Sequence, residues 1–113
     1  MVFKESEIRD IARSLAKCIK KRIPIEKIII FGSYAYGKPC QYSDIDLAVI
    51  SSAFKRMDNI KRIAFLLDAA RKIKTKVPVD IEPLGFTLEE LDNADYFDIA
   101  AEIKERGKVV YGK

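Results

Sequence analysis

Apolar residues recur every three to four positions in two long stretches of the chain. In residues 5–22 and in residues 58–75, charged side chains fill the positions between them, which predicts two amphipathic helices. Asp58 or Asn59 is suited to cap the start of the second helix. The stripe of this helix that we expect to pack onto a sheet consists of Ile60, Ile63, Ala64, Leu67, Ala70 and Ile73.

Shorter apolar runs with many β-branched residues alternate with these helices. Residues 25–32, 44–50 and 77–84 have the composition of strands, and Pro78 and Pro83 favour a short or edge strand for the third. Residues 108–112 are expected to add a strand or an extended tail. Two more helices are predicted: one from a Thr87–Glu90 capping box to Asn93, and one over residues 96–107. This order predicts an α/β (α+β) fold, a small mixed β-sheet covered by helices.

Composition narrows the class of protein. The 113 residues are 49% apolar and 34% charged, which predicts a single domain spanning residues 1–113. No apolar run is long enough to cross a membrane and the first residues lack a signal-peptide core, so we expect a cytoplasmic protein. The absence of histidine excludes histidine-based zinc sites, triads and general bases. Cys18 and Cys40 are expected to remain thiols.

Charge is unevenly distributed along the chain. Residues 53–76 carry eight basic and two acidic side chains, whereas residues 77–113 carry four basic and nine acidic ones. This asymmetry suggests a phosphate-rich ligand at one surface and a basic protein partner at another, although most of these charges are typical of solvated helix faces. The basic runs lack interleaved aromatic residues, so nucleic-acid binding is not expected.

Two aspartates at the start of the second strand suggest a metal site. Asp44 and Asp46 project from the same face of a strand and repel each other unless a cation lies between them. Hard oxygen ligands suit Mg²⁺ or Mn²⁺, although an exposed strand end with solvated acids is the simpler reading of the pair alone. Gly32 and Ser33 follow the first strand and could form a phosphate cradle at the same end of the sheet.

A third carboxylate is expected to complete such a site. Asp80, between two apolar residues of the third predicted strand, is the candidate, and Glu82 is its competitor. We favour Asp80 because Glu82 abuts Pro83 at the expected strand end.

These residues resemble the signature of a known superfamily. Gly32-Ser33, ten intervening residues and then Asp44-Ile45-Asp46, with Asp80 further on, resemble the DNA polymerase β-like nucleotidyltransferases. The helix before the first strand and the closing "IKERGKVVYG" are similar to the minimal nucleotidyltransferases of bacteria and archaea, antitoxins that are commonly paired with a HEPN-type toxin.

The resemblance implies a reaction and a set of roles. An antitoxin of this kind would transfer AMP from ATP to a tyrosine hydroxyl of a HEPN ribonuclease, as a homodimer or as a hetero-oligomer with the toxin. Two Mg²⁺ ions, with Mn²⁺ as an alternative, would be held by Asp44, Asp46 and Asp80, and the nucleotide by Gly32, Ser33, Ser43 and Lys38. Tyr36 departs from the pattern because many relatives carry arginine there. Two alternatives stay open: a non-catalytic module that occludes its partner, and a small-molecule nucleotidyltransferase.

Overall fold

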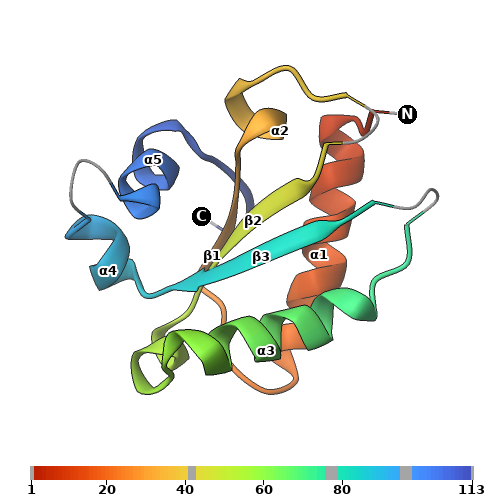
Figure 1. Ribbon diagram of the computed structural model, residues 1–113. Coiled ribbons are helices and arrows are strands. Elements are labelled where there is room, and N and C mark those ends of the chain that lie inside the picture. Colours follow the sequence, from red (N-terminus) through yellow and green to blue (C-terminus); the bar gives the residue numbers. More distant parts are fainter. Residues whose placement is uncertain (1, 41–42, 76–78, 95–97, 113) are drawn as a thin grey trace.

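A four-stranded mixed sheet forms the centre of the molecule. The computed structural model describes residues 2–40, 43–75, 79–94 and 98–112. The sheet has the order β3-β2-β1-β4, with bounds β1 Lys27–Phe31, β2 Ile45–Ile50, β3 Ile81–Phe86 and β4 Lys108–Gly112. β1 pairs antiparallel with β2 and β4, whereas β2 and β3 are parallel (Figure 1). The predicted fold class is therefore confirmed, and residues 108–112 form an edge strand.

Helices cover both faces of this sheet (Figure 1). α1 (Glu5–Lys20) and α3 (Asn59–Arg71) pack on one face, and α4 (Leu88–Asp92) and α5 (Ile99–Arg106) on the other. The short α2 (Ser33–Tyr36) follows β1, and the 3₁₀ helix η1 (Ser52–Arg56) follows β2. Among these described helices, none is long and apolar enough to cross a membrane.

The alternation of side chains along the central strands builds two cores. Ile28 and Ile30 of β1 face α1 and α3, whereas Ile29 and Phe31 face α4 and α5. In β2, Leu47 and Val49 join the first core, and Ala48 and Ile50 join the second. Because both faces are covered, the two strands read as continuous apolar runs.

The third strand lies later in the chain than expected. β3 begins at Ile81 rather than at residue 77, and residues 76–78 lie outside the described part of the chain. Pro83 lies inside the strand, buried and opposite Leu47 of β2. An edge strand tolerates proline because one row of its backbone groups needs no partner strand. The predicted edge position is thus confirmed, but Pro83 does not end the strand.

The predicted buried stripe of α3 was wrong for its first four members, which are exposed, whereas Ala70 and Ile73 pack against the core as predicted. The helix starts after Asp58, whose side chain accepts a hydrogen bond from the backbone N–H of Lys61, as the sequence suggested. The residues that it buries, however, are Arg62, Leu66 and Ala69, whereas Ile60 is 80% exposed, Ile63 45% and Leu67 37%. Relative to the predicted orientation, the helix is rotated about its axis, because the side that packs on the sheet includes Arg62, which has buried hydrogen-bond partners of its own.

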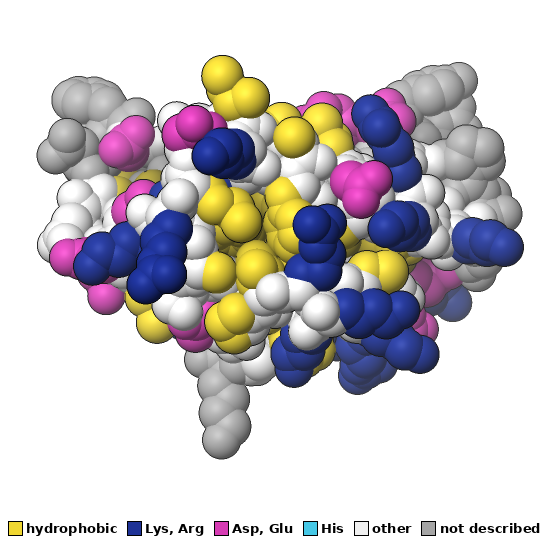
Figure 2. All heavy atoms as spheres, turned by 90° about the horizontal axis from the view of Figure 1, so that it is seen from below, with side chains coloured by type: hydrophobic (Ala, Val, Ile, Leu, Met, Phe, Trp, Pro, Cys, Tyr) yellow, Lys and Arg dark blue, Asp and Glu magenta, His cyan; other side chains and the backbone are white. Residues whose placement is uncertain are grey.

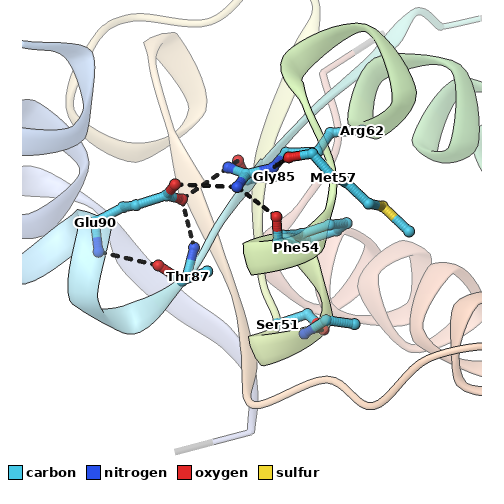
Figure 3. A network of polar contacts seen from close by, with 8 residues as sticks. Ser51, Phe54, Met57, Arg62, Gly85, Thr87 and Glu90 are labelled. Atoms are coloured by element: carbon cyan, nitrogen blue, oxygen red, sulfur yellow. Dashed lines mark hydrogen bonds and ion pairs between the residues drawn. The ribbon is translucent and has the colours of Figure 1, made fainter.

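Arg62 connects three elements that follow β2 (Figure 3). Its guanidinium donates to the backbone carbonyls of Met57, Phe54 and Gly85 and, through both terminal nitrogens, to the Glu90 carboxylate at 2.7 and 3.0 Å. All five N–H donors are therefore used. Glu90 also accepts from the backbone N–H of Thr87 in the predicted capping box that starts α4. A polar network thus joins α3, β3 and α4.

Candidate active site

The glycine-serine pair and the aspartate pair meet at one end of the sheet. Phe31, the last residue of β1, pairs with Asp46 near the start of β2, so Gly32 lies beside the Asp46 side chain. Gly32 has φ 72° and ψ −153°, a region that is essentially restricted to glycine. A Cβ atom on Gly32 would lie 2.3 Å from Oδ2 of Asp46. Both conformation and space therefore require glycine where the chain passes the carboxylate.

Three acidic side chains gather next to this glycine. Asp46 of β2 lies in register with Glu82 of the parallel strand β3, and their carboxyl groups are close enough to share a hydrogen bond when one of them is protonated. Burial raises the pKa of Asp46, and the negative charge of Asp44 raises it further, against the opposing effect of the Glu82 hydrogen bond. Burial and the charges of Asp44 and Asp46 also raise the pKa of Glu82. Like charges held this close favour binding of a proton or a cation.

Asp80 and Glu82 are placed differently. Glu82 interacts with both Asp44 and Asp46. Asp80 precedes β3, and its backbone carbonyl accepts a hydrogen bond from Ile45 N–H at 2.9 Å. Asp80 is exposed and lines a hollow at the end of α3 together with Arg71 and apolar residues. Of the two candidates for the third carboxylate, Glu82 is the one that contacts the aspartate pair.

α5 adds groups that the sequence did not indicate. The charge of Glu102 acts on Asp46, and the Glu102 carboxylate is also close enough to the Tyr36 hydroxyl to influence its pKa. The Arg106 guanidinium lies 4.0 Å from the centre of the Tyr36 ring. Burial and Glu102 raise the pKa of Tyr36, while Gly32 and Arg106 act to lower it. A cation thus stands over Tyr36, the position where the resemblance leads us to expect arginine.

No local sequence pattern marks Glu102 or Arg106 as part of a site. They lie more than 50 residues after Asp46 and occupy ordinary positions of an amphipathic helix. Only the packing of α5 against β1 brings them to Tyr36.

The remaining predicted nucleotide-binding residues lie in or after α2. Ser33 is the first residue of α2, directly after Gly32. The Ser43 hydroxyl accepts a hydrogen bond from the backbone N–H of Cys40 at 2.9 Å, and Ser43 N–H donates to the Cys40 carbonyl. Ser43 therefore orders the approach to Asp44. Lys38 is exposed beyond the end of α2.

The acidic groups suit a magnesium ion that is shared with a ligand. Within residues 2–40, 43–75, 79–94 and 98–112, no three acidic or cysteine side chains form a ready-made metal cage. Mg²⁺ rarely needs one, because it keeps several waters and is usually held by one or two carboxylates together with substrate phosphates. Asp44, just before β2, and Asp46, within it, are both half-buried and supply such ligands. The donor set therefore fits Mg²⁺ or Mn²⁺ bound together with a phosphate-bearing ligand.

Mixed-sheet topology, a glycine against an aspartate and clustered carboxylates define the class of protein. The family model described as "Polymerase beta, Nucleotidyltransferase" matches residues 13–113. The chain therefore belongs to the polymerase beta nucleotidyltransferase family. This confirms the family that the Gly-Ser and Asp-Ile-Asp motifs suggested.

Two relatives come from Methanocaldococcus jannaschii, and both carry the name "Putative protein adenylyltransferase". MJ0128 is 46% identical over 44 residues, which are 39% of this chain and 45% of that protein. MJ0604 is 27% identical over 107 residues, covering 95% of this chain and 97% of that protein. The chain thus matches about half the length, or less, of MJ0128 and two similar relatives.

A solved structure agrees with this assignment. One chain in a crystal structure of a toxin-antitoxin with AMP-PNP is 26% identical to this chain, with a TM-score of 0.60. The match covers 98% of this chain and 75% of that one.

Proposed function

We propose that this chain transfers AMP from ATP to a hydroxyl group of a protein partner and that it acts as an antitoxin. The observation that carries the proposal is the close approach of Gly32 to the Asp46 carboxylate, because a turn suited to phosphate would then lie against an aspartate suited to a metal ion. The relatives named as protein adenylyltransferases and the toxin-antitoxin structure with AMP-PNP support the substrate and the biological setting. A HEPN-type ribonuclease with an acceptor tyrosine is the partner that we infer.

The reaction requires an in-line displacement at the α-phosphorus. The acceptor oxygen forms a bond to phosphorus, the bond to the bridging oxygen breaks, and pyrophosphate leaves with the electron pair. Asp44 and Asp46 would hold one or two Mg²⁺ ions, which neutralise triphosphate charge and lower the pKa of the attacking hydroxyl when bound. Gly32 and Ser33 would bind the β- and γ-phosphates, and correct positioning supplies much of the rate.

The third carboxylate and a cation complete this assignment. We assign the third carboxylate role to Glu82, which reaches both aspartates, with Asp80 as the alternative from the sequence. Its raised pKa suits a group that takes the proton of the acceptor hydroxyl. Arg106, over the Tyr36 ring, is placed to offset negative charge that a nucleotide would bring to this end of the sheet.

An intact-mass measurement tests the proposal. The product of the gene adjacent to the one encoding this chain is incubated with this chain, ATP and Mg²⁺, and its mass should increase by one or more AMP units. The Asp44→Asn/Asp46→Asn variant should give no increase while its circular dichroism spectrum stays unchanged. A partner that binds but is never modified would instead indicate an antitoxin that acts by occlusion.

A further inference from the structure

The solvent-facing side of α3 is unusually apolar. Four residues at positions i, i+3, i+4 and i+7 form what we call the apolar face of α3: Ile60, Ile63, Ala64 and Leu67. Ile60 is 80% exposed and Ile63 45%, although both are large apolar side chains. Single exposed apolar residues are ordinary, but a contiguous set on one helix is typical of an interaction surface.

A hollow extends this face toward β3. Leu67 belongs both to the apolar face and to the hollow, which is also lined by four apolar residues, Ala70, Ile73, Val79 and Ile81, and by three polar ones, Arg71, Thr75 and Asp80. On the other side, the guanidinium of Arg22, which follows the end of α1, lies 5.2 Å from the ring centre of Phe65. The apolar face is therefore bordered by a hollow of mixed polarity on one side and by a cationic edge on the other.

Basic residues surround the apolar face. Figure 2 looks onto this side of the molecule and shows hydrophobic side chains in the middle, with many lysine and arginine side chains and several acidic ones around them. The exposed members of this basic rim in and next to α3 are Lys55, Arg56, Lys61, Arg71, Lys72 and Lys74. Of the two acids in the same segment, Asp58 caps the helix and Asp68 pairs with Lys72 at 3.5 Å. The net field over this surface is strongly positive.

The charge pattern selects the kind of occupant. A second copy docked face to face would bring two basic rims together, which is repulsive. Nucleic acid would match the charge, but the exposed centre consists of aliphatic side chains, which neither stack on bases nor bind phosphate. A protein surface that is apolar at its centre and acidic at its edge matches both features.

This surface is also separate from the candidate active site. Asp46 projects from the same side of β2 as Ala48 and Ile50, toward α4 and α5, whereas α3 packs on the opposite side with Leu47 and Val49. A partner on α3 therefore leaves the carboxylates open. We propose that the apolar face of α3 docks a protein partner with an apolar centre and an acidic edge. This inference rests on the proposed function, because it supplies a second contact for the protein that receives AMP.

Paired surface variants test the docking surface. Binding of the purified product of the adjacent gene to this chain is measured by calorimetry. Ile60→Glu/Ile63→Glu should weaken it about tenfold or more, and raising the salt should weaken binding to the unaltered chain. Ile99→Glu is the matched control, because Ile99 is 44% exposed and lies at the start of α5 on the other face. Its affinity should not change.

The outcomes separate docking from catalysis. The Asp44→Asn/Asp46→Asn variant should dock normally without transferring AMP, and the α3 double variant should still bind ATP. Unchanged affinity in the α3 variant, or no binding by the unaltered chain, overturns the docking proposal. Two other results would also overturn it: self-association of this chain that Ile60→Glu abolishes, and tight binding of a 20-nucleotide RNA through the same face. Docking without transfer by the unaltered chain contradicts the proposed function alone.

Discussion

Charged side chains are arranged in opposite ways at the two ends of β3: they are paired at one end, whereas acidic side chains cluster at the other. At its C-terminal end, Arg62 uses every N–H donor, and its charge is balanced by Glu90. At its N-terminal end, Glu82 lies against Asp44 and Asp46 without a matching cation among the described contacts, and the pKa values of Glu82 and Asp46 are raised. A satisfied network stabilises a fold, whereas gathered like charges weaken it unless a ligand binds. The first end is thus structural, and the second is the end where we propose the active site.

Removal of the Arg62 guanidinium should have the largest effect on the stability of the fold. Arg62→Met keeps the apolar stem but leaves three backbone carbonyls and Glu90 without their donor. We expect the free energy of unfolding to fall by about 3–5 kcal/mol, as measured by urea denaturation. Arg22→Met, at an exposed arginine that stacks on Phe65, is the control and should cost under about 1 kcal/mol. Equal losses of stability in both variants would contradict the conclusion that the hydrogen bonds of Arg62 stabilise the fold.

Substitution of the aspartates near the N-terminal end of β3 should have the opposite pattern of effects: activity should fall and stability should not. Asp44→Asn/Asp46→Asn should lower AMP transfer by at least roughly 10²- to 10³-fold, an effect of at least about 2.7–4 kcal/mol on the barrier, so that no product is detected. The same change removes repulsion with Glu82, so the folded state should be at least as stable as before. Initial rates and urea denaturation of the same preparation measure both effects. A loss of stability in this variant would mean that Asp44 and Asp46 stabilise the fold.

Much of this contrast was visible in the sequence. Alternation places Asp46 on one face of β2, with Asp44 two residues earlier just before the strand, and the Thr87–Glu90 capping box was found where it was expected. The third carboxylate was harder to choose, because it depends on the register between β2 and β3, and Pro83 was taken as the strand end.

Long-range packing was not visible. The sequence placed Ile60 and Ile63 against the sheet because apolar spacing cannot tell a core face from a docking face. The buried stripe contains Arg62, whose partners on η1, β3 and α4 appear only in the folded chain. Glu102 and Arg106 reach Tyr36 for the same reason, through the packing of α5.

A pair of single variants decides which carboxylate is third. Glu82→Gln should lower transfer about 10- to 100-fold, by analogy with groups that orient metal ligands, because it loses contacts with both aspartates. Asp80→Asn should change the rate much less, since Asp80 borders the α3 hollow. Both rates are measured at saturating ATP and Mg²⁺. The reverse order would restore the assignment made from the sequence.

Arg106 should affect nucleotide binding more than the fold. Arg106→Gln removes the cation over Tyr36 while keeping a helix-forming residue in the last turn of α5. We expect the KM for ATP to rise by about tenfold, or about 1.4 kcal/mol, with little change in kcat. Arg106→Lys should recover part of the loss, and Lys104→Gln on the outer side of the same helix should have no effect. A fall in kcat alone would assign Arg106 a different role.

Proton titration compares the two ends in the same stability measurement. Hydrogen bonds from Arg62 lower the pKa of Glu90, so its contribution is present above its unfolded pKa near 4.5 and is lost as the pH falls through the folded value. Burial and neighbouring acids raise the pKa of Glu82, so its ionisation destabilises the fold as the pH rises above about 4.5. At pH 7, Glu90→Gln should therefore lower stability and Glu82→Gln should raise it, each by about 1 kcal/mol or less because both groups are exposed. Both differences in the free energy of unfolding should shrink toward pH 3 in urea denaturation.

A ligand adds a second comparison: Mg²⁺ with ATP should stabilise the unaltered chain more than the Glu82→Gln variant. If the two variants shift stability in the same direction at pH 7, the carboxylates at the two ends of β3 do not have opposite effects on stability.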